Sequence, residues 1–370
     1  MTRARVRNDI RHGLKSMDGS IKVQYEKLER FVNLIFQRLG MPVADATIAA
    51  RVLVMADLRG VDSHGVIRLS WDKWYVKAIR DGIINPNPQI GIVNETPVTA
   101  LIEGDGGMGM VVGHRAVEVA IEKARRSGVG MVAVRNSRHF GMSAYYAMLA
   151  LPHDMIGISM TNAGRQVVPT FGQEAKYGTN PICLAAPALE EPPFVLDMAT
   201  TTAAAGKLEV AARRGHPIPL GWALDEKSEP TTDPRAAQRA RKLLPVGSTR
   251  EGGSHKGYGL AIMVEILCGV LTGTVACLTP PATGVRGHFF GAINISGFRP
   301  VEEFKRDLDN LLRDLKSTAP EKGQNRVYVA GEIEHETAQE RSANGIPLHS
   351  STLGYLRELS QQLHVPYDLG

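Results

Sequence analysis

The spacing of apolar residues changes along the chain, and this change constrains the fold more than any other feature. Between residues 155 and 223 the apolar residues form short segments, 156–160, 182–186 and 194–198, which are separated by turn residues. Short apolar segments bounded in this way are typical of strands. The sequence therefore predicts a mixed α/β fold whose middle is rich in strands.

Longer segments with a helical spacing of apolar residues lie mainly toward the two ends of the chain. They predict helices over residues 23–39, 45–59, 116–126, 257–271, 301–315 and 353–363, with further strands over 98–102 and 130–134. Because 370 residues exceed the usual size of one compact core, two or three domains are expected. No apolar run is long enough to predict a membrane span.

Charge and cysteine content favour a cytoplasmic protein that binds no nucleic acid. The formal net charge is +5, and the basic residues are scattered without interleaved aromatic residues. The cysteines Cys183, Cys268 and Cys277 are an odd, unpatterned set in apolar contexts, which indicates free thiols in a reducing compartment. No ligand spacing predicts a metal site. The basic residues 1–20 predict a disordered extension.

The segment DSHGVIRL, which begins at Asp62, places a histidine four residues before an arginine. If the segment is helical, His64 and Arg68 share one face and can reach the same small molecule. An arginine fork matches a carboxylate, and a histidine exchanges protons near neutral pH. The pair therefore suits a 2-hydroxy or 2-keto acid, although solvated or ion-paired residues show the same spacing.

The segment Gly104-x-Gly106-x-x-Gly109 has the spacing of a dinucleotide-binding fingerprint. In that motif the next strand ends in an acidic residue, whereas here residues 130–134 are followed by Arg135 and Asn136. Only one such βαβ unit is visible. The sequence therefore favours a glycine turn between a strand and a helix over a Rossmann site.

Four other segments have the composition of loops that approach a ligand. His139 follows a buried strand, and residues 178–181 form a turn whose backbone N–H groups can meet a phosphate. Asp197 follows another strand, where it can orient a histidine or cap the next helix. Lys256 lies at the expected start of a helix, where an anion can bind.

Taken in order, these segments resemble the type-2 malate/L-lactate dehydrogenase family, which is unrelated to the Rossmann lactate dehydrogenases. That family includes ureidoglycolate dehydrogenase, sulfolactate dehydrogenase, diketogulonate reductase and piperideine-2-carboxylate reductase. The matching motifs are DSHGVIRL, GDGGMG, NSRHFG, YGTNP, DMATT, PTTDP and HKGYGL, and Ala330-Gly331-Glu332 is similar to the family's Pro-Gly-Glu. The resemblance covers about residues 22–348.

The resemblance implies a homodimeric oxidoreductase of small 2-hydroxy or 2-keto acids with NAD or NADP as cofactor, NAD being favoured. The implied fold is α/β and non-Rossmann, with helical terminal regions packed around a β-rich inserted cofactor domain. Residues 21–140 and 300–370 would form the substrate and dimerisation domain, and residues 141–299 the NAD(P)-binding domain.

The resemblance also implies that His64, Ser63 and Arg68 line the substrate site and that His139 matches the family's proposed proton acceptor. We predict that His64, His139 and Asp197 are catalytic and that Ser63, Arg68 and Tyr75 bind the substrate. The implied cofactor contacts are Gly178, Thr179, Asn180, Pro181, Asp197, Met198, Ala199, His255, Lys256, Gly331 and Glu332.

The chain departs from the family pattern at the substrate pocket. The family has a tyrosine four residues after the arginine, at a position that is Asp72 here, and Tyr75 is recovered only by allowing three extra residues. The stretch 247–254 is also longer than expected, and Arg138 or Arg250 could meet a 2′-phosphate.

Several alternatives stay open at this point. Either His64 or His139 could move the proton, and the substrate could be malate, lactate, sulfolactate, ureidoglycolate or a cyclic imino acid. A hydrolase using Ser63 and His64 is disfavoured because the chain has no Gly-x-Ser-x-Gly elbow. A metabolite-binding paralogue without catalysis is the remote alternative.

Overall fold

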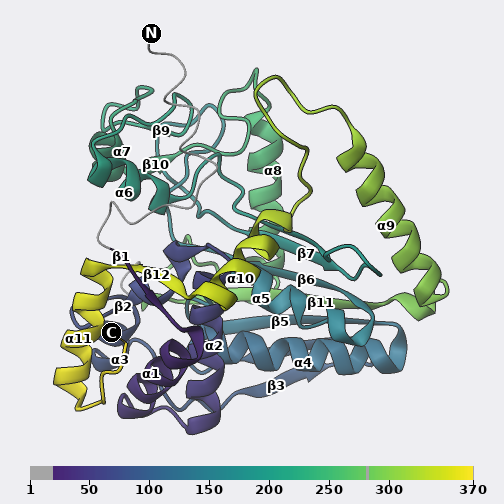
Figure 1. The fold of residues 1–370 in the computed structure, drawn as a ribbon, viewed down its shortest axis with the longest axis horizontal. Coiled ribbons are helices and arrows are strands. Elements are labelled where there is room, and N and C mark those ends of the chain that lie inside the picture. The colour runs from purple at the N-terminus through teal and green to yellow at the C-terminus, as the bar shows by residue number, and fades with distance from the viewer. Residues whose placement is uncertain (1–19, 281–282, 370) are drawn as a thin grey trace. The chain divides into compact units, whose positions relative to one another are not determined.

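The chain forms two compact units, and its last part returns to the unit in which it began (Figure 1). The computed structural model describes residues 20–280 and 283–369, so all but the last residue of the predicted basic extension lie outside it. The first unit comprises residues 20–78 and 336–369, and the second comprises residues 79–335. These boundaries differ from the predicted 140 and 299, and the division of substrate and cofactor binding between domains stays a prediction.

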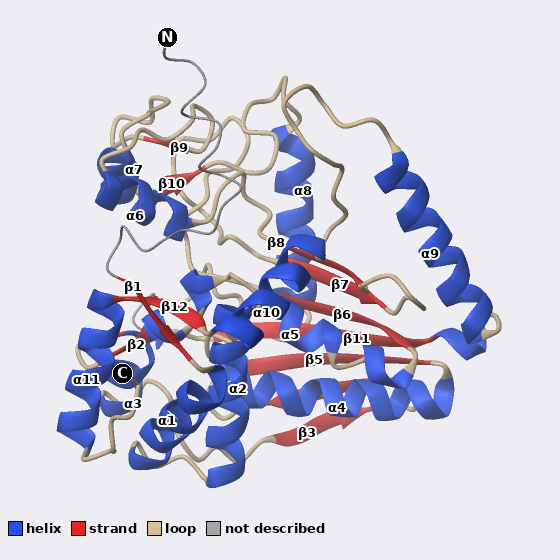
Figure 2. Ribbon diagram, viewed as in Figure 1, coloured by secondary structure: helices blue, strands red, loops and turns tan. Residues whose placement is uncertain are grey.

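A seven-stranded sheet is the framework of the second unit (Figure 2). Its order is β3-β4-β5-β11-β6-β7-β8, and only β4 and β5 are parallel, with α4 (Gly109–Ser127) as their crossover. The strands are β3 (Gly91–Glu95), β4 (Thr99–Glu103), β5 (Val129–Ser137), β6 (Met155–Thr161), β7 (Ile182–Ala186), β8 (Phe194–Met198) and β11 (Arg286–Asn294). A single parallel pair does not make a Rossmann domain, and the predicted non-Rossmann α/β fold is confirmed.

Two glycines let helices approach one face of this sheet closely. Gly130 and Gly157 stand in the same row of the sheet, on either side of Ala292. A Cβ at either position would lie 2.0 Å from a helix carbonyl oxygen, that of Ala120 in α4 or that of Ala147 in α5 (Ser143–Met148). Only glycine fits this contact, so α4 and α5 cover the same face.

The predicted helix 257–271 is continuous but changes its geometry. It begins as α8 (Ser254–Val264) and continues as the π-helical segment η4 (Glu265–Val270), which contacts β11, β5 and β6. π-helical turns are rare and are frequent at functional sites. Above the sheet, α6 (Ala205–Arg214), α7 (Pro234–Ala240), β9 (Ala223–Leu224) and β10 (Lys242–Leu243) enclose a small separate core.

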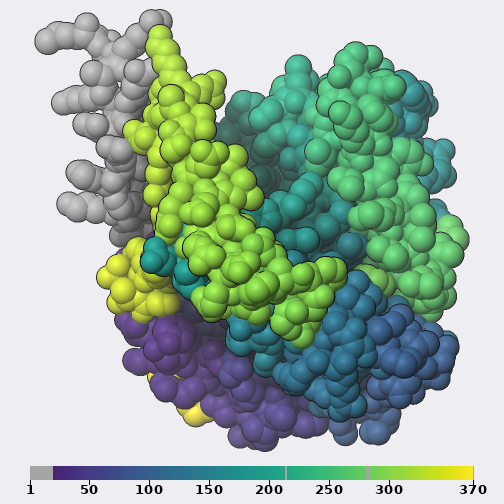
Figure 3. All heavy atoms as spheres, turned by 90° about the vertical axis from the view of Figure 1, so that its right-hand side faces the viewer, coloured from purple at the N-terminus to yellow at the C-terminus, as the bar shows by residue number. Residues whose placement is uncertain are grey.

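Helix α9 (Val301–Ser317) is tied to the loop between β7 and β8. The carboxylate of Asp309 accepts backbone hydrogen bonds from Leu189, Glu190 and Glu191, and Lys316 pairs with Glu191. Figure 3 shows this face, where the surface is hollowed between α9 and the teal and green segments of the second unit. The chain then leads into α10 (Glu332–Asn344).

The first unit is built on the helices α1 (Tyr25–Arg38), α2 (Val43–Leu58) and α11 (Ser350–Leu363). In α1 the residues at helical spacing, Leu28, Phe31, Val32, Ile35 and Phe36, are all buried, because one apolar stripe faces the core. Strand β1 (Ser20–Val23) pairs antiparallel with β12 (Ile346–His349), and α3 (Trp74–Arg80) leads to the second unit. Within the described ranges, no helix is both long and apolar enough to cross a membrane.

Candidate active site

The His64 segment is not an α-helix, and the conditional prediction of one helical face is wrong. It consists of two 3₁₀ turns, η1 (Asp62–His64) and η2 (Val66–Arg68), and Gly65 between them is extended. Backbone hydrogen bonds from His64 to Val61 and from Arg68 to Gly65 close the two turns. His64 and Arg68 still lie near each other, since after burial the positive charge of Arg68 is the second cause that lowers the pKa of His64.

A buried carboxyl group supports this segment, and sequence reasoning missed it. Asp57, near the end of α2, is only 2 % exposed, and its Oδ2 accepts the backbone N–H of Val66 at 2.8 Å. A Cβ on Gly65 would lie 1.9 Å from the Oδ1 of Asp57. Burial raises the pKa of Asp57 well above its usual value, and the Val66 hydrogen bond opposes the shift. The glycine of the motif is therefore required by the position of this carboxyl group.

Arg341 holds the same corner from the returning part of the chain. Its Nη1 donates to the backbone carbonyl of Asp57 and pairs with the Asp62 carboxylate at 2.5 Å. The turn that carries His64 is thus fixed on two sides.

The guanidinium of Arg68 is oriented by its own segment. Its Nε donates to the carbonyl of Ser63 at 2.7 Å, and its carbon lies 4.2 Å from the ring centroid of Trp74. The three extra residues, 72–74, lie in a tight hairpin in which Leu69 pairs with Trp74. Tyr75 follows and is buried, and burial raises its pKa while the charge of Arg68 opposes the rise. The departure from the family pattern therefore places an indole against the predicted carboxylate-binding arginine.

His64 is held in its neutral form. Its Nδ1 lies 3.0 Å from the hydroxyl oxygen of Ser63. Burial, with a further contribution from Arg68, lowers the pKa of His64 from 6.5 to about 3. A neutral imidazole is the form that can accept a proton.

In the second unit, the predicted segments converge at one end of the sheet, here called the loop end. Strands β4, β5, β6 and β8 finish there, whereas β7 and β11 begin there, as their pairing shows. Segments that leave or enter neighbouring strands at the same edge of a sheet lie close together. The loop end consists of residues 104–109, 136–141, 162–165, 178–181, 197–199 and the start of β11 at Arg286.

His139 at the loop end has a defined hydrogen-bonding pattern. The backbone N–H of Gly141 donates to its Nδ1 at 3.2 Å, so a neutral His139 carries its proton on Nε2. The following Phe140 stacks between Tyr146 and His288, with ring centroids 4.8 and 4.9 Å away. His288 is fully buried, bonded to Ser137 and Thr161, and its pKa is lowered to about 3, first by burial. This stack fixes the loop that presents His139.

The predicted cofactor turn 178–181 is anchored by a buried polar network that the sequence did not reveal. Asn180 is fully buried, and it accepts the N–H of Ala163 and donates to the carbonyl of Ala261 and to Glu265. Asn162 also donates to Glu265, whose pKa is raised by burial. The side chain of Asn180 therefore positions the turn, and Gly178, Thr179 and Pro181 remain its candidate ligand contacts.

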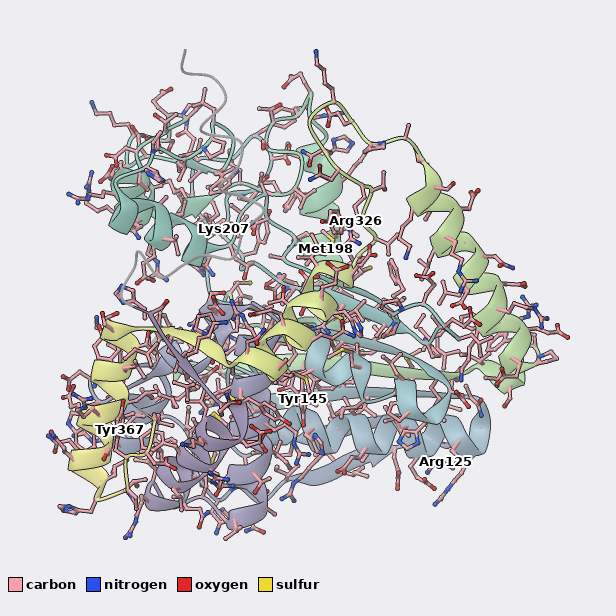
Figure 4. All side chains as sticks on the ribbon, viewed as in Figure 1. Arg125, Tyr145, Met198, Lys207, Arg326 and Tyr367 are labelled. Carbon is pink, nitrogen blue, oxygen red and sulfur yellow. The ribbon has the colours of Figure 1, made fainter. Side chains whose placement is uncertain are left out.

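Asp197 does not cap the next helix, α6, but bonds to α5, which precedes it in the chain. It is exposed at the end of β8, and its Oδ2 accepts the N–H of Ala144 at 2.7 Å, in the first turn of α5. The half-buried Met198 and Ala199 follow it, and Figure 4 labels Met198 on β8 and Arg326 in the segment leading to α10.

Gly331 brings the end of that segment against β8. It has a φ of +91°, and a Cβ there would lie 2.8 Å from that of Val195, whose N–H donates to the carbonyl of Ala330. The buried Glu332 carboxylate lies 3.5 Å from the ammonium of Lys316. The predicted Gly331-Glu332 pair is thus next to β8.

The start of α8 fits an anionic group. Gly253 precedes it without a side-chain cap, and His255 and Lys256 are both exposed in its first turn. Acidic residues usually occupy the first turn of a helix, because the N-terminal end is electropositive. Basic residues at that end favour a phosphate instead. The Nη1 of Arg250, a residue predicted as a candidate for binding a 2′-phosphate, lies 3.0 Å from the Nδ1 of His255. The start of α8 is therefore a candidate contact for a phosphate group.

Comparison with known proteins gives a consistent result over nearly the whole chain. The family model described as malate/L-lactate dehydrogenase matches residues 23–357. The malate dehydrogenase of Pyrococcus abyssi is 44% identical over 94% of this chain and 96% of its own length. The L-sulfolactate dehydrogenase of Methanocaldococcus jannaschii is 40% identical, over 91% and 96%. The crystal structure of malate dehydrogenase from Entamoeba histolytica superposes with a TM-score of 0.89 at 35% identity, covering 94% of this chain and 99% of that one.

Proposed function

Because the chain belongs to the malate/L-lactate dehydrogenase family and is a dehydrogenase of small hydroxy acids with a nicotinamide cofactor, we propose that it interconverts malate and oxaloacetate. The 44% identity to a malate dehydrogenase carries this choice among the hydroxy acids of the family. The geometry around Arg68 and His64 supports it, since it supplies a carboxylate-binding group and a neutral base in one short segment.

Arg68 binds the carboxylate beside the reacting carbon. Its Nε is engaged by Ser63 and one face is covered by Trp74, so the orientation of the fork is set before the substrate arrives. Ordering a binding group in advance lowers the entropy lost on binding and favours a near-attack geometry. We assign Tyr75, which is buried near Arg68, to substrate binding as well.

His64 moves the proton of the reacting hydroxyl. When Nδ1–H donates to the hydroxyl of Ser63, the Nε2 of His64 is left unprotonated and can accept that proton. A bound carboxylate on Arg68 offsets the positive charge that contributes to the low pKa of His64, so substrate binding raises that pKa toward the working range. His139 of the second unit, whose neutral form carries its proton on Nε2, is the alternative proton carrier.

The cofactor is held by the second unit. Thr179, Met198 and Gly331 with their neighbours, and Lys256 at α8, are the residues that would contact it, and Asp197 positions α5. A bound nicotinamide would supply the hydride transfer that the reaction needs. We propose NAD over NADP, a homodimeric assembly and a cytoplasmic location.

Absorbance at the reduced-nicotinamide band tests the proposal directly. Purified protein is assayed with NAD and NADP against malate, lactate, sulfolactate and ureidoglycolate. Malate oxidation with the highest kcat/KM is expected, and a higher value for another acid would replace malate. Replacing His64→Ala should lower kcat by roughly 100- to 10,000-fold, the usual contribution of acid–base catalysis. Near-normal turnover in that variant, with a large loss in His139→Ala, would transfer the role to His139.

A further inference from the structure

Two arginines lie side by side at the loop end, and neither has a role in the site described above. Arg286 begins β11 and pairs with Ser137, the last residue of β5, so Arg138 follows directly beside it. Both side chains are half-buried, so each keeps a surface that a ligand can reach. His139, the histidine of the loop, is the next residue after Arg138.

Among the residues that the structure describes, Arg138 is held by neutral oxygens alone. Its Nε donates to the carbonyl of Ile83 at 2.8 Å, and its Nη1 donates to the carbonyl of Ser137 and to the amide oxygen of Asn136. These bonds fix the guanidinium and leave its charge unbalanced. The backbone of Gly106 lies against Nη2, where a Cβ would be 3.1 Å away. The glycine turn that resembled a dinucleotide fingerprint thus leaves room for this side chain.

Arg286 is less constrained. Its Nη1 donates to the carbonyl of Val285 at 2.6 Å. Across residues 20–280 and 283–369, neither Arg138 nor Arg286 forms an ion pair within 4.0 Å. Glu265 is the acidic group whose charge acts on Arg286, but its carboxyl is buried and bonded to Asn180 and Asn162.

Two adjacent, partly desolvated cations without an acidic partner are unfavourable in the ligand-free protein. Burial lowers the pKa of both arginines; for Arg286 the charge of Glu265 opposes this shift, and the charge of Arg138 adds to it. Removing charge from water without a partner destabilises a fold. An anion that accepts hydrogen bonds from Arg286 would relieve both the repulsion and the desolvation.

We propose that Arg138 and Arg286 form a binding site for an oxyanion group, either a carboxylate of a dianionic substrate or a phosphate of the cofactor. This inference rests on the proposed function, whose substrate and cofactor both carry such groups. The two sources share one chemistry, and kinetics separate them.

The test compares Arg286→Gln with the wild type on malate, on lactate and on each cofactor. If the group is a substrate carboxylate, loss of a charge-assisted bond should lower kcat/KM for malate by about 10- to 100-fold and leave that for lactate and the KM of the cofactor unchanged. A rise confined to the KM of NAD or NADP would assign the site to a cofactor phosphate. If neither changes, the site is refuted. Arg126→Gln is the matched control, because it removes an exposed charge on α4 that pairs with Glu122.

A binding measurement without turnover keeps this test separate from the proposed reaction. Succinate and inorganic phosphate are titrated against the thermal unfolding of wild type, Arg286→Gln and Arg286→Lys. Either anion should raise the Tm of the wild type, less so that of the lysine variant, and not that of the glutamine variant. If these shifts in Tm are observed but malate is not turned over, the anion site is supported and malate is rejected as the substrate. An equal rise in wild type and Arg286→Gln would reject the site, as would a glutamine variant that unfolds well below the wild type without ligand.

Discussion

Replacing Gly65→Ala should both destabilise the first unit and impair the reaction. The new Cβ would lie 1.9 Å from Oδ1 and 2.1 Å from Cγ of Asp57, so the carboxyl group must move. Its movement breaks the 2.8 Å hydrogen bond from the N–H of Val66, a residue that is fully buried. A buried N–H without a partner costs about 1–3 kcal/mol, and forcing a methyl group into a packed site costs a similar amount.

We therefore expect the free energy of unfolding to fall by about 2–4 kcal/mol in urea titrations. Displacement of His64 and Arg68 by as little as 1 Å should lower kcat/KM by about 100-fold. The double variant Asp57→Ala/Gly65→Ala removes the group that clashes, so its loss of stability should be smaller than the sum of the two single losses, by at least about 0.5 kcal/mol.

Gly354→Ala is the matched control in the same unit. It lies in α11 with nothing within 4 Å of the added Cβ, and should gain about 0.5–1 kcal/mol, the usual difference between alanine and glycine in a helix. Gly65→Ala with wild-type stability and turnover would show that Asp57 does not hold the segment. Strict additivity in the double variant would show the same.

Three further predictions follow from the contacts described. Trp74→Ala removes the ring that stacks on Arg68 and should raise the KM for malate about 2- to 5-fold, since an exposed cation–π contact contributes about 0.5–1 kcal/mol; an unchanged KM would mean the stack does not orient the guanidinium. Gly331→Ala combines a φ of +91° with a clash against Val195 and should weaken NADH binding in a fluorescence titration, whereas wild-type affinity would remove that segment from the cofactor site. The pKa of His288 is about 3 in the folded protein and near 6.5 in the unfolded chain, so the free energy of unfolding decreases as the pH falls through this window. His288→Gln should reduce the slope of the free energy of unfolding against pH, between pH 4 and 6, by about 1.4 kcal/mol per pH unit. An unchanged slope would contradict the buried neutral state.

Local spacing predicted the elements whose form depends on their own sequence. The stripe Leu28, Phe31 and Ile35 indicates α1 without reference to any other part of the chain, and β6, β7 and β8 follow from their short apolar runs. Strand β11 was not predicted. It contains two glycines and a buried histidine, and its pairing with both β5 and β6 supplies the hydrogen bonds that make it a strand.

The sequence predicted the residues of the candidate site, but not the residues that hold them in place. His64 and Arg68 carry recognisable chemistry, whereas their 3₁₀ geometry depends on Asp57 and Arg341, which no spacing connects to them. Arg286 reaches the loop end only because β11 pairs with β5. Such contacts arise from tertiary structure, and a single sequence has no local signal for them.

The return of the chain to the first unit has a consequence for biosynthesis. Strand β1 pairs with β12, so Ser20 meets His349, and Arg341 secures the turn of His64. A nascent chain can fold residues 79–335 while the partners of its opening segment are still unmade. Until residues 336–369 leave the ribosome, α1 can pack on α2 but lacks α11, and β1 lacks β12, so part of the apolar surface of the first unit stays exposed. The histidine proposed for catalysis is encoded early but reaches its final geometry last, so we expect a product truncated before residue 336 to be inactive even when its central sheet has formed.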